Sequence, residues 1–389
     1  MQAEEFRATA SLAAVFSVRL LGLFMIYPVF AAYADTLPGS NPYLIGEALG
    51  IYGLTQGLLQ IPFGLLSDKF GRKRMIVIGL LLFALGSAVA AYSTSMAGVI
   101  VGRALQGAGA VGAVILAMVA DLTSEKTRTK AMAVVGITIG ASFLIALVAG
   151  PIAASIIGVP GIFWLMVVLA ALGIAVTLFV VPTPKRESLH RDAETVPAFF
   201  GSVLRDPALL KLDLGIFVLH AILTASFLVV PGLLRTTLSV APNNDWMIYL
   251  PVLLVSVVVM GGAIGLGDRR GKSEMVFIYA IMALALGNAM LLYGSGDAVM
   301  LIAALIVFFS AFNILEANLP SLVSKAAPAR AKGTALGVYS SLQFLGIFAG
   351  GALGGFINQS GGATGVFAFT MTLALIWLLV AAAVRRRVA

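Results

Sequence analysis

Several ionisable side chains lie inside long apolar stretches of this sequence, where a charge is costly. Glu316 lies in the stretch FSAFNILEAN. Its carboxyl group is a candidate proton carrier, because removal from water favours the neutral form of an acid. Arg103 lies in GRALQGAG, and Asp213 precedes His220 by seven residues in another apolar stretch. We take these four residues as candidates for proton coupling, although His220 alone fits a hydrogen-bonded contact between helices better.

Other polar side chains recur at helical spacing within apolar stretches. Any one of them is explained by hydrogen bonding between neighbouring helices. Together with 23 Phe and 14 Met residues, they suit a large and mostly apolar cavity for amphipathic organic compounds. The candidates for a substrate cavity are Arg19, Tyr27, Tyr52, Gln56, Gln60, Gln106, Asn313 and Gln343.

The residue types needed for metal or covalent chemistry are scarce. The sequence has no cysteine, and its only two histidines, His190 and His220, are far apart. It has neither the G-x-S-x-G pattern of serine hydrolases nor the H-E-x-x-H pattern of zinc proteases. We therefore expect no enzyme activity, no cofactor and no metal site.

The elements that carry these residues are expected to be membrane helices. The chain has 389 residues, of which 60% are hydrophobic and 11% are charged. About 20 apolar residues in a helix cross a bilayer, and a helix satisfies its own backbone hydrogen bonds there. The sequence predicts twelve such segments, at residues 11–34, 44–66, 75–92, 96–120, 131–157, 161–181, 212–234, 246–266, 275–293, 298–323, 334–357 and 362–384. The first is expected to be an uncleaved helix rather than a signal peptide, because Arg19 interrupts it.

The placement of basic residues is an independent test of this count. When the loops are numbered alternately, one side receives all but three of the 25 Lys and Arg residues. The three exceptions are Arg19 and Arg103 within helices and Arg235 in a loop on the other side. Since Lys and Arg favour cytoplasmic loops, both termini are predicted to be cytoplasmic. The net charge of +8 then reflects topology, and no nucleic-acid partner is expected.

A weak internal repeat divides the chain into two parts. The stretch DKFGR at 68–72 recurs as DRRGK at 268–272, and RTKA at 128–131 recurs as RAKG at 330–333. Parallel repeats of this kind are typical of transporters with a site between the repeats. We predict a six-helix bundle at 1–182, a cytoplasmic linker at 183–210 and a second six-helix bundle at 211–389.

The loop between the second and third segments reads GLLSDKFGRKR, from Gly64 to Arg74. It resembles the major facilitator superfamily motif G-x-L-x-D-R-x-G-R-[RK], with Lys69 in place of the usual Arg. The resemblance implies a cytoplasmic gate in which an acid at the end of the fourth helix joins the loop and latches the outward-open state. The gating residues it assigns are Gly64, Asp68, Lys69, Gly71, Arg72, Lys73 and Asp121. Asp121 follows Arg103 by 18 residues, five turns of a continuous helix, and would lie on the same face.

Two further stretches resemble motifs of the same superfamily. Arg103 to Gly109 matches R-x-x-Q-G-x-G, which the family associates with proton-coupled movement. Gly140, Gly150 and Pro151 partly match an antiporter motif ending G-P-x-x-G-G, although Ala154 and Ser155 replace the last two glycines. Small residues there would permit close helix approach, and proline would bend the helix.

The resemblance looks closest to the drug:proton antiporters, in particular to the YajR-like group. It implies an all-α membrane protein of the major facilitator fold, with twelve helices in two pseudo-symmetric bundles. The implied function is export of small amphipathic compounds in exchange for protons, by a monomer in the inner membrane. The partners would be the substrate, protons and the bilayer. A proton-linked symporter or sugar exporter on the same fold, and a nontransporting membrane sensor, stay open as alternatives. A soluble domain can follow the twelfth helix in this group; we expect the chain to lack it or to be part of a longer protein.

Overall fold

The computed structural model of the chain describes residues 2–183, 195–241, 244–269 and 273–388. Within these ranges the regular elements are all helices. Part of the predicted linker, at 184–194, and residues 270–272 of the repeated motif lie outside the described residues. The α-helices are α1 (Ala3–Phe24), α2 (Tyr27–Ala34), α3 (Pro42–Phe70), α4 (Arg72–Tyr92), α5 (Met96–Ala108), α6 (Gly112–Asp121), α7 (Glu125–Ala175), α8 (Phe200–Val203), α9 (Pro207–Phe227), α10 (Val230–Thr237), α11 (Trp246–Arg269), α12 (Ser273–Gly294), α13 (Ala298–Ala326) and α14 (Lys332–Val388).

Short polar side chains set where several of these helices begin. The Asn41 side chain accepts a hydrogen bond from the backbone N–H of Leu44 at 2.9 Å and starts α3. Asp206 does the same for α9, and Asp297 for α13. These residues satisfy backbone donors that have no partner in the first turn of a helix.

Ten helical stretches of the described chain are long and apolar enough to cross a membrane. Two of them, Glu125–Val180 and Ala329–Ala383, have 56 and 55 residues, more than twice the length that one crossing needs. Each contains one glycine with a positive φ, Gly158 at 68° and Gly362 at 56°, where two helices join at a kink. Both glycines lie at predicted boundaries between segments. The count of twelve separate spans stays a prediction.

Three segments that the sequence predicts as continuous helices are interrupted. The first breaks between α1 and α2, and the seventh breaks between α9 and α10. Pro28 and Pro231 lie at the first or second position of α2 and α10, and proline lacks the N–H that would continue the preceding helix. The fourth breaks between α5 and α6, so the face shared by Arg103 and Asp121 cannot be counted along one straight helix.

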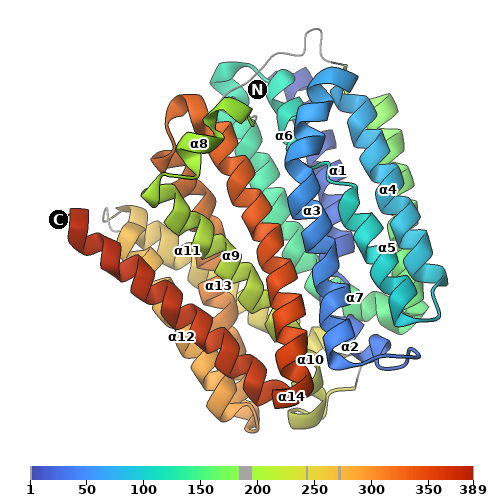
Figure 1. Ribbon diagram of the computed structural model, residues 1–389, viewed down its shortest axis with the longest axis vertical. Helices are drawn as coiled ribbons and strands as arrows, with labels where there is room; N and C mark the ends of the chain where they lie inside the picture. Colours follow the sequence, from blue (N-terminus) through green and yellow to red (C-terminus); the bar gives the residue numbers. More distant parts are fainter. Residues whose placement is uncertain (1, 184–194, 242–243, 270–272, 389) are drawn as a thin grey trace.

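For description we call α1 to α7 the first group of helices and α8 to α14 the second group, by their order in the chain (Figure 1). In the first group, α1 and α4 pack against α7, and α5 packs against α3 and α4. In the second group, α9 packs along α14, and α13 packs against α11 and α12. The most extensive contact between the groups joins α3 to α14.

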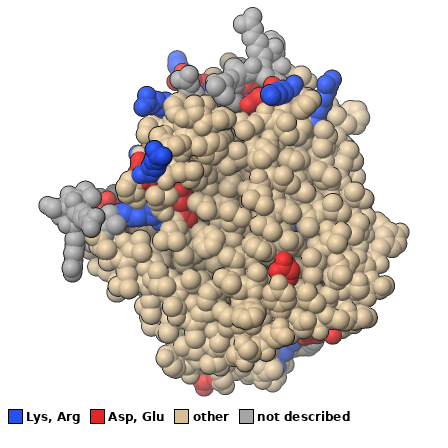
Figure 2. All heavy atoms as spheres, in the orientation of Figure 1, with Lys and Arg blue, Asp and Glu red and all other residues tan. Residues whose placement is uncertain are grey.

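Charged side chains gather at one end of the molecule. Figure 2 shows Lys and Arg residues near the upper end and upper left, and a wide surface across the middle that is free of charged groups apart from a small acidic patch. Many large apolar side chains of the molecule are exposed, among them Ile156, Phe179 and Tyr293. An apolar belt between charged ends is the surface that a lipid bilayer covers.

Candidate functional site

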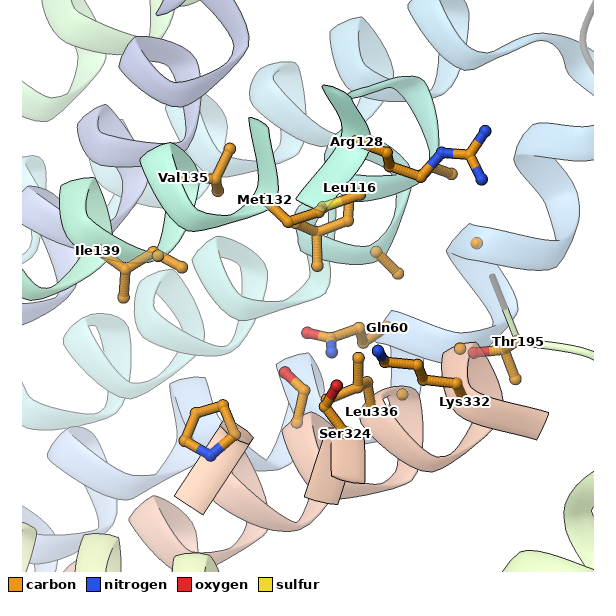
Figure 3. Close-up of a pocket in the computed structure, with 18 of the residues that line it drawn as sticks. Gln60, Leu116, Arg128, Met132, Val135, Ile139, Thr195, Ser324, Lys332 and Leu336 are labelled. Carbon is orange, nitrogen blue, oxygen red and sulfur yellow. The ribbon is translucent and has the colours of Figure 1, made fainter. Parts of the chain in front are cut away.

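A cavity of about 600 Å³ lies between the two groups of helices (Figure 3). One wall comes from α3, α6 and α7, and the other comes from α13 and α14, with Thr195 at one edge. Leu116, Val135, Ile139 and Leu336 make much of the lining apolar. This volume and lining are typical of sites that bind small organic molecules.

The polar end of the cavity lies where α4, α7 and α14 begin. Arg128 of α7 and Lys332 of α14 lie on opposite walls at this end, and Asp68 and Arg72 also line it (Figure 3). We call this the basic end of the molecule. It belongs to the side that receives most of the Lys and Arg residues in the sequence.

The opposite end is closed by direct contact between α3 and α14. A Cβ atom on Gly46 would lie 2.1 Å from the carbonyl oxygen of Gly351, and one on Gly53 would lie 2.4 Å from that of Phe344. Contact continues to Gly57 opposite Ser341, after which the helices separate and Gln60 and Ser340 line the cavity. No side chain fits between the helices along this contact, so the cavity ends there.

Aromatic side chains join the two groups next to this contact. The Tyr27 and Thr224 hydroxyl oxygens lie 3.2 Å apart, and the Tyr27 and Phe227 rings lie 5.5 Å apart. The rings of Phe143 and Phe312 lie 5.4 Å apart across the same interface. Tyr27 therefore packs within the closure and does not line the cavity.

The structure brings three of the predicted gating residues together at the basic end. Arg72 is buried, and its side chain bonds Asp68 and, at 3.2 Å, the carboxylate of Asp121. Gly71 has a φ of 92°, which allows the tight turn between α3 and α4. Gly64 packs against α6, where its Cβ would lie 3.4 Å from that of Ala113. Lys69 and Lys73 lie nearer the surface.

A buried basic cluster occupies the first group. We define it as Arg19 and Arg103 with their hydrogen-bond partners. Arg19 donates to the Tyr52 hydroxyl at 2.9 Å and to the Gln56 side chain, which donates to Gln60 at 3.1 Å. Gln60 is the member that reaches the cavity wall.

Arg103 is fully buried against α3 and its own helix. It donates to the carbonyl oxygen of Ala48 at 3.2 Å and to the Gln106 side chain at 3.0 Å, and it lies over the Tyr52 ring at 5.0 Å. Gln106 in turn donates to Ser87 at 2.8 Å. Long polar side chains in apolar helices thus satisfy one another, which places Arg19, Tyr52, Gln56 and Gln106 away from the cavity lining.

A buried acidic cluster occupies the second group. We define it as Glu316 of α13, Asp213 and His220 of α9, and Gln343 of α14. The Gln343 amide donates to Glu316 Oε1 at 3.2 Å and lies 2.9 Å from His220 Nε2. His220 Nε2 lies 3.8 Å from Glu316 Oε2. Glu316 adjoins Ala317, which lines the cavity, and its side chain is 28% exposed.

The remaining candidates lie apart from one another. Asn313 donates to Ser256 of α11 at 2.8 Å, which directs it into the second group. Gly150 lies against the α1–α2 junction, where a Cβ would meet the Met25 carbonyl oxygen at 2.3 Å. Gly140 has no neighbour of this kind within 4 Å, and Pro151 lies inside α7. The close approach that the antiporter-like motif predicts is therefore found at Gly150 and not at Gly140.

Sequence reasoning missed several residues of the site. Lys332, Ser324 and Thr195 line the cavity, but a polar residue near a helix end gives no sign of facing a cavity. Tyr339 was also missed, although it lies four residues before Gln343 and so on the same face of α14.

Comparison with known proteins agrees with this architecture. A model of the Major Facilitator Superfamily matches residues 12–351 and 266–389. The inner membrane transport protein YajR of Escherichia coli is 45% identical over 98% of this chain and 84% of its own length. Multidrug resistance protein 2 of Bacillus subtilis is 27% identical over 87% of this chain and 86% of its own length.

A solved structure has the same fold. The crystal structure of the human organic anion transporter MFSD10 superposes with a TM-score of 0.71 at 19% identity, covering 98% of this chain and all of that one. Together with the family match, this likeness accounts for the all-helical membrane architecture and the absence of an enzyme motif. The chain belongs to the Major Facilitator Superfamily of membrane transporters.

Proposed function

We propose that this transporter exports small amphipathic organic compounds in exchange for protons by alternating access. Residues 1–182 and 211–389 act as two six-helix bundles joined by the linker at 183–210, in a monomer of the inner membrane. The basic end, with both termini, faces the cytoplasm, because Lys and Arg favour that side. In this orientation the cavity is open to the cytoplasm and closed toward the outside.

The observation that carries the proposal is the cavity between the two groups, bounded at one end by the contact between α3 and α14. A compound entering from the basic end meets a mostly apolar chamber of about 600 Å³. Release to the outside requires α3 and α14 to separate and the basic end to close. Relatives named multidrug resistance proteins support the choice of amphipathic substrates.

The acidic cluster supplies the proton step. Glu316 binds a proton from the outside and releases it to water in the cavity when the basic end is open. One charge crossing 100 mV provides about 2.3 kcal/mol, which is enough to drive a useful concentration gradient. Asp213 and His220 complete the proton-coupling group, and Arg103 couples the first bundle to it.

The charged turn between α3 and α4 acts as the gate at the basic end. Arg72 holds Asp68 and Asp121 together in the open cavity. When the basic end closes, the turn between α3 and α4 approaches the start of α14. This turn carries Gly64, Asp68, Lys69, Gly71 and Lys73. Tyr27 then leaves its contact with Thr224. The other polar side chains predicted to form the substrate cavity become accessible to the substrate. Gln60 already lines the cavity.

The test uses purified protein in liposomes with an imposed pH gradient and a panel of lipophilic cations. The native chain is expected to move substrate against proton flow, and Glu316→Gln is expected to lose this driven flux. Glu274→Gln is the matched control, because Glu274 is an exposed acid at the start of α12 and should transport normally.

The direction of flux separates the alternatives. Movement of substrate in the same direction as protons would replace antiport by symport. Binding of substrate without any flux would support a sensor. Driven flux that Glu316→Gln leaves intact would remove Glu316 as the carrier.

A further inference from the structure

Four buried polar atoms without a hydrogen-bond partner among the described residues surround one region of the second group. They are both carboxylate oxygens of Asp213, the Tyr339 hydroxyl and Oε2 of Glu316. Asp213 is 1% exposed and Tyr339 is 5% exposed. A buried carboxylate without a donor is costly, so this region needs a proton, a cation or ordered water.

The packing of α9 along α14 sets the level of Asp213. Gly346 meets the carbonyl oxygen of Phe217, and Gly350 meets that of Ala221, each with a Cβ distance of 2.2 Å. Both pairs are 129 residues apart, so the two helices run parallel in one register. The same offset places Asp213 level with residue 342, between Tyr339 and Gln343.

Tyr339 lies on the face of α14 that packs along α9. It precedes Gln343 by four residues and Gly346 by seven, so it shares the helix face that meets Phe217. Gln343, one turn further along α14, bonds Glu316 and His220. The side chains of α14 therefore connect the carboxyl group of α9 with that of α13.

We propose that Asp213, Tyr339 and Glu316 form one buried proton-binding site, in which the Tyr339 hydroxyl connects the two carboxyl groups. In this conformation the hydroxyl bonds neither carboxyl group, so transfer requires the side chains to approach one another. On approach, a proton leaves one carboxyl group for the Tyr339 oxygen as the hydroxyl proton passes to the other carboxylate. The hydroxyl is restored, and nothing is oxidised or reduced. Two acids sharing a low-dielectric site cannot both ionise cheaply, so they titrate as a pair.

The other ionisable groups around the site are few within the described part of the chain. His220 faces Glu316 from α9. Lys211 of α9 and Glu274 of α12 interact with each other nearer the basic end. Tyr27 of α2 meets α9 at Thr224, beyond His220. Among the described residues, His220 is the basic group that lies against the site. Lys211, Glu274 and Tyr27 make no hydrogen bond or ion pair there with Asp213 or Glu316.

The inference rests on the proposed function for its role in transport, but proton binding is measured without transport. Infrared spectra of the purified full chain are recorded against pH, and the protonated carboxyl band lost in Glu316→Gln is followed. Asp213→Asn and Tyr339→Phe are each expected to move its midpoint by about one pH unit or more, a tenfold change in proton affinity. Tyr249→Phe is the matched control, since Tyr249 is a buried tyrosine of α11 whose hydroxyl also has no described partner.

An unchanged midpoint in both Asp213→Asn and Tyr339→Phe would overturn the shared site, whatever transport shows. An equal shift of the midpoint in Tyr249→Phe would mean that loss of any buried tyrosine hydroxyl changes the midpoint. That result would also overturn the shared site. A change of these bands with Na⁺ at constant pH would assign the site to sodium instead. Failure of the proposed antiport would appear separately, as absence of driven flux in a protein whose carboxyl bands still behave as a pair.

Discussion

The basic cluster and the acidic cluster are both buried, but they differ in how well their polar atoms are satisfied. One side-chain atom of the basic cluster, Arg19 Nε, has no hydrogen-bond partner among the described residues, against three in the acidic cluster. Arg103 donates through all three of its nitrogens, to Ala48, Gln106 and Leu49. Neither oxygen of Asp213 has a partner among the described residues, and Glu316 uses one of its two. A guanidinium keeps its charge and needs permanent acceptors, whereas a carboxyl group can take up a proton. The comparison indicates that the first group holds a constant charge and that the second group holds a variable one.

Removal of the Arg103 charge should have the largest effect on the free energy of unfolding. Arg103→Leu leaves the Gln106 side chain and the Ala48 carbonyl oxygen without this donor, so we expect a loss of about 2–4 kcal/mol in stability. Thermal unfolding in detergent measures it, with Arg103→Lys expected to lose less. A variant as stable as the native protein would mean that the basic cluster is not structural.

An acid that has a basic partner sharpens the comparison. Asp245 is buried at the closed end and lies 3.3 Å from Arg235. Burial raises the pKa of Asp245 to about 6, and Arg235 opposes this rise. Because the folded state holds the proton more tightly than the unfolded state, stability should fall as the pH rises from about 4 to about 6.

The size of this pH effect is at most about 3 kcal/mol, from a shift of about two pH units. Unfolding midpoints measured across this range should decline in the native chain and should decline less in Asp245→Asn. Parallel curves for the two proteins would show that Arg235 already compensates the buried charge.

The contact between α3 and α14 can be broken without changing either cluster. Gly46→Ala places a methyl group 2.1 Å from the Gly351 carbonyl oxygen, and overpacking of this kind costs about 1–3 kcal/mol. We expect α3 and α14 to separate and the basic end to close. Because the chain has no cysteine, labelling of Ser324→Cys in the cavity should report this as slower reaction. Gly261→Ala is the control, since a Cβ there meets nothing within 4 Å and Gly261 does not line the cavity.

Neutralising the variable charge should have the smallest effect on stability. Asp213→Asn keeps the shape of the side chain and breaks no described hydrogen bond, so we expect a change within about 1 kcal/mol. Thermal unfolding of Asp213→Asn and Arg103→Leu under the same conditions compares the two losses of stability directly. A loss as large as that of Arg103→Leu would show that Asp213 has a structural partner and would remove the distinction between the clusters.

Much of the fold could be predicted because apolar length and charge placement are local properties. The predicted boundaries near residues 158–160 and 358–361 adjoin the kinks at Gly158 and Gly362. The interruptions after Phe24, Ala108 and Phe227 were not predicted, because hydropathy is uniform across them. Pro28 and Pro231 were the available signals for two of these breaks.

The candidate site was predictable only in part. The bonds of Arg72 to Asp68 and Asp121 follow a motif that can be read in sequence. No sequence motif predicts that Gln60 lines the cavity while Gln56 bonds Arg19. Both glutamines lie on one face of α3, and their surroundings depend on where α14 diverges from it.

The sequence alone determined that the chain is a set of apolar helices with basic loops on one side and a few ionisable residues within them. These properties follow from transfer free energies and backbone hydrogen bonding, which act residue by residue. The tertiary structure decided which buried charges are satisfied, where the cavity lies and which end is closed. Those features depend on contacts between residues far apart in the chain, such as Gly46 with Gly351 and Glu316 with Gln343, and only packing brings such residues together.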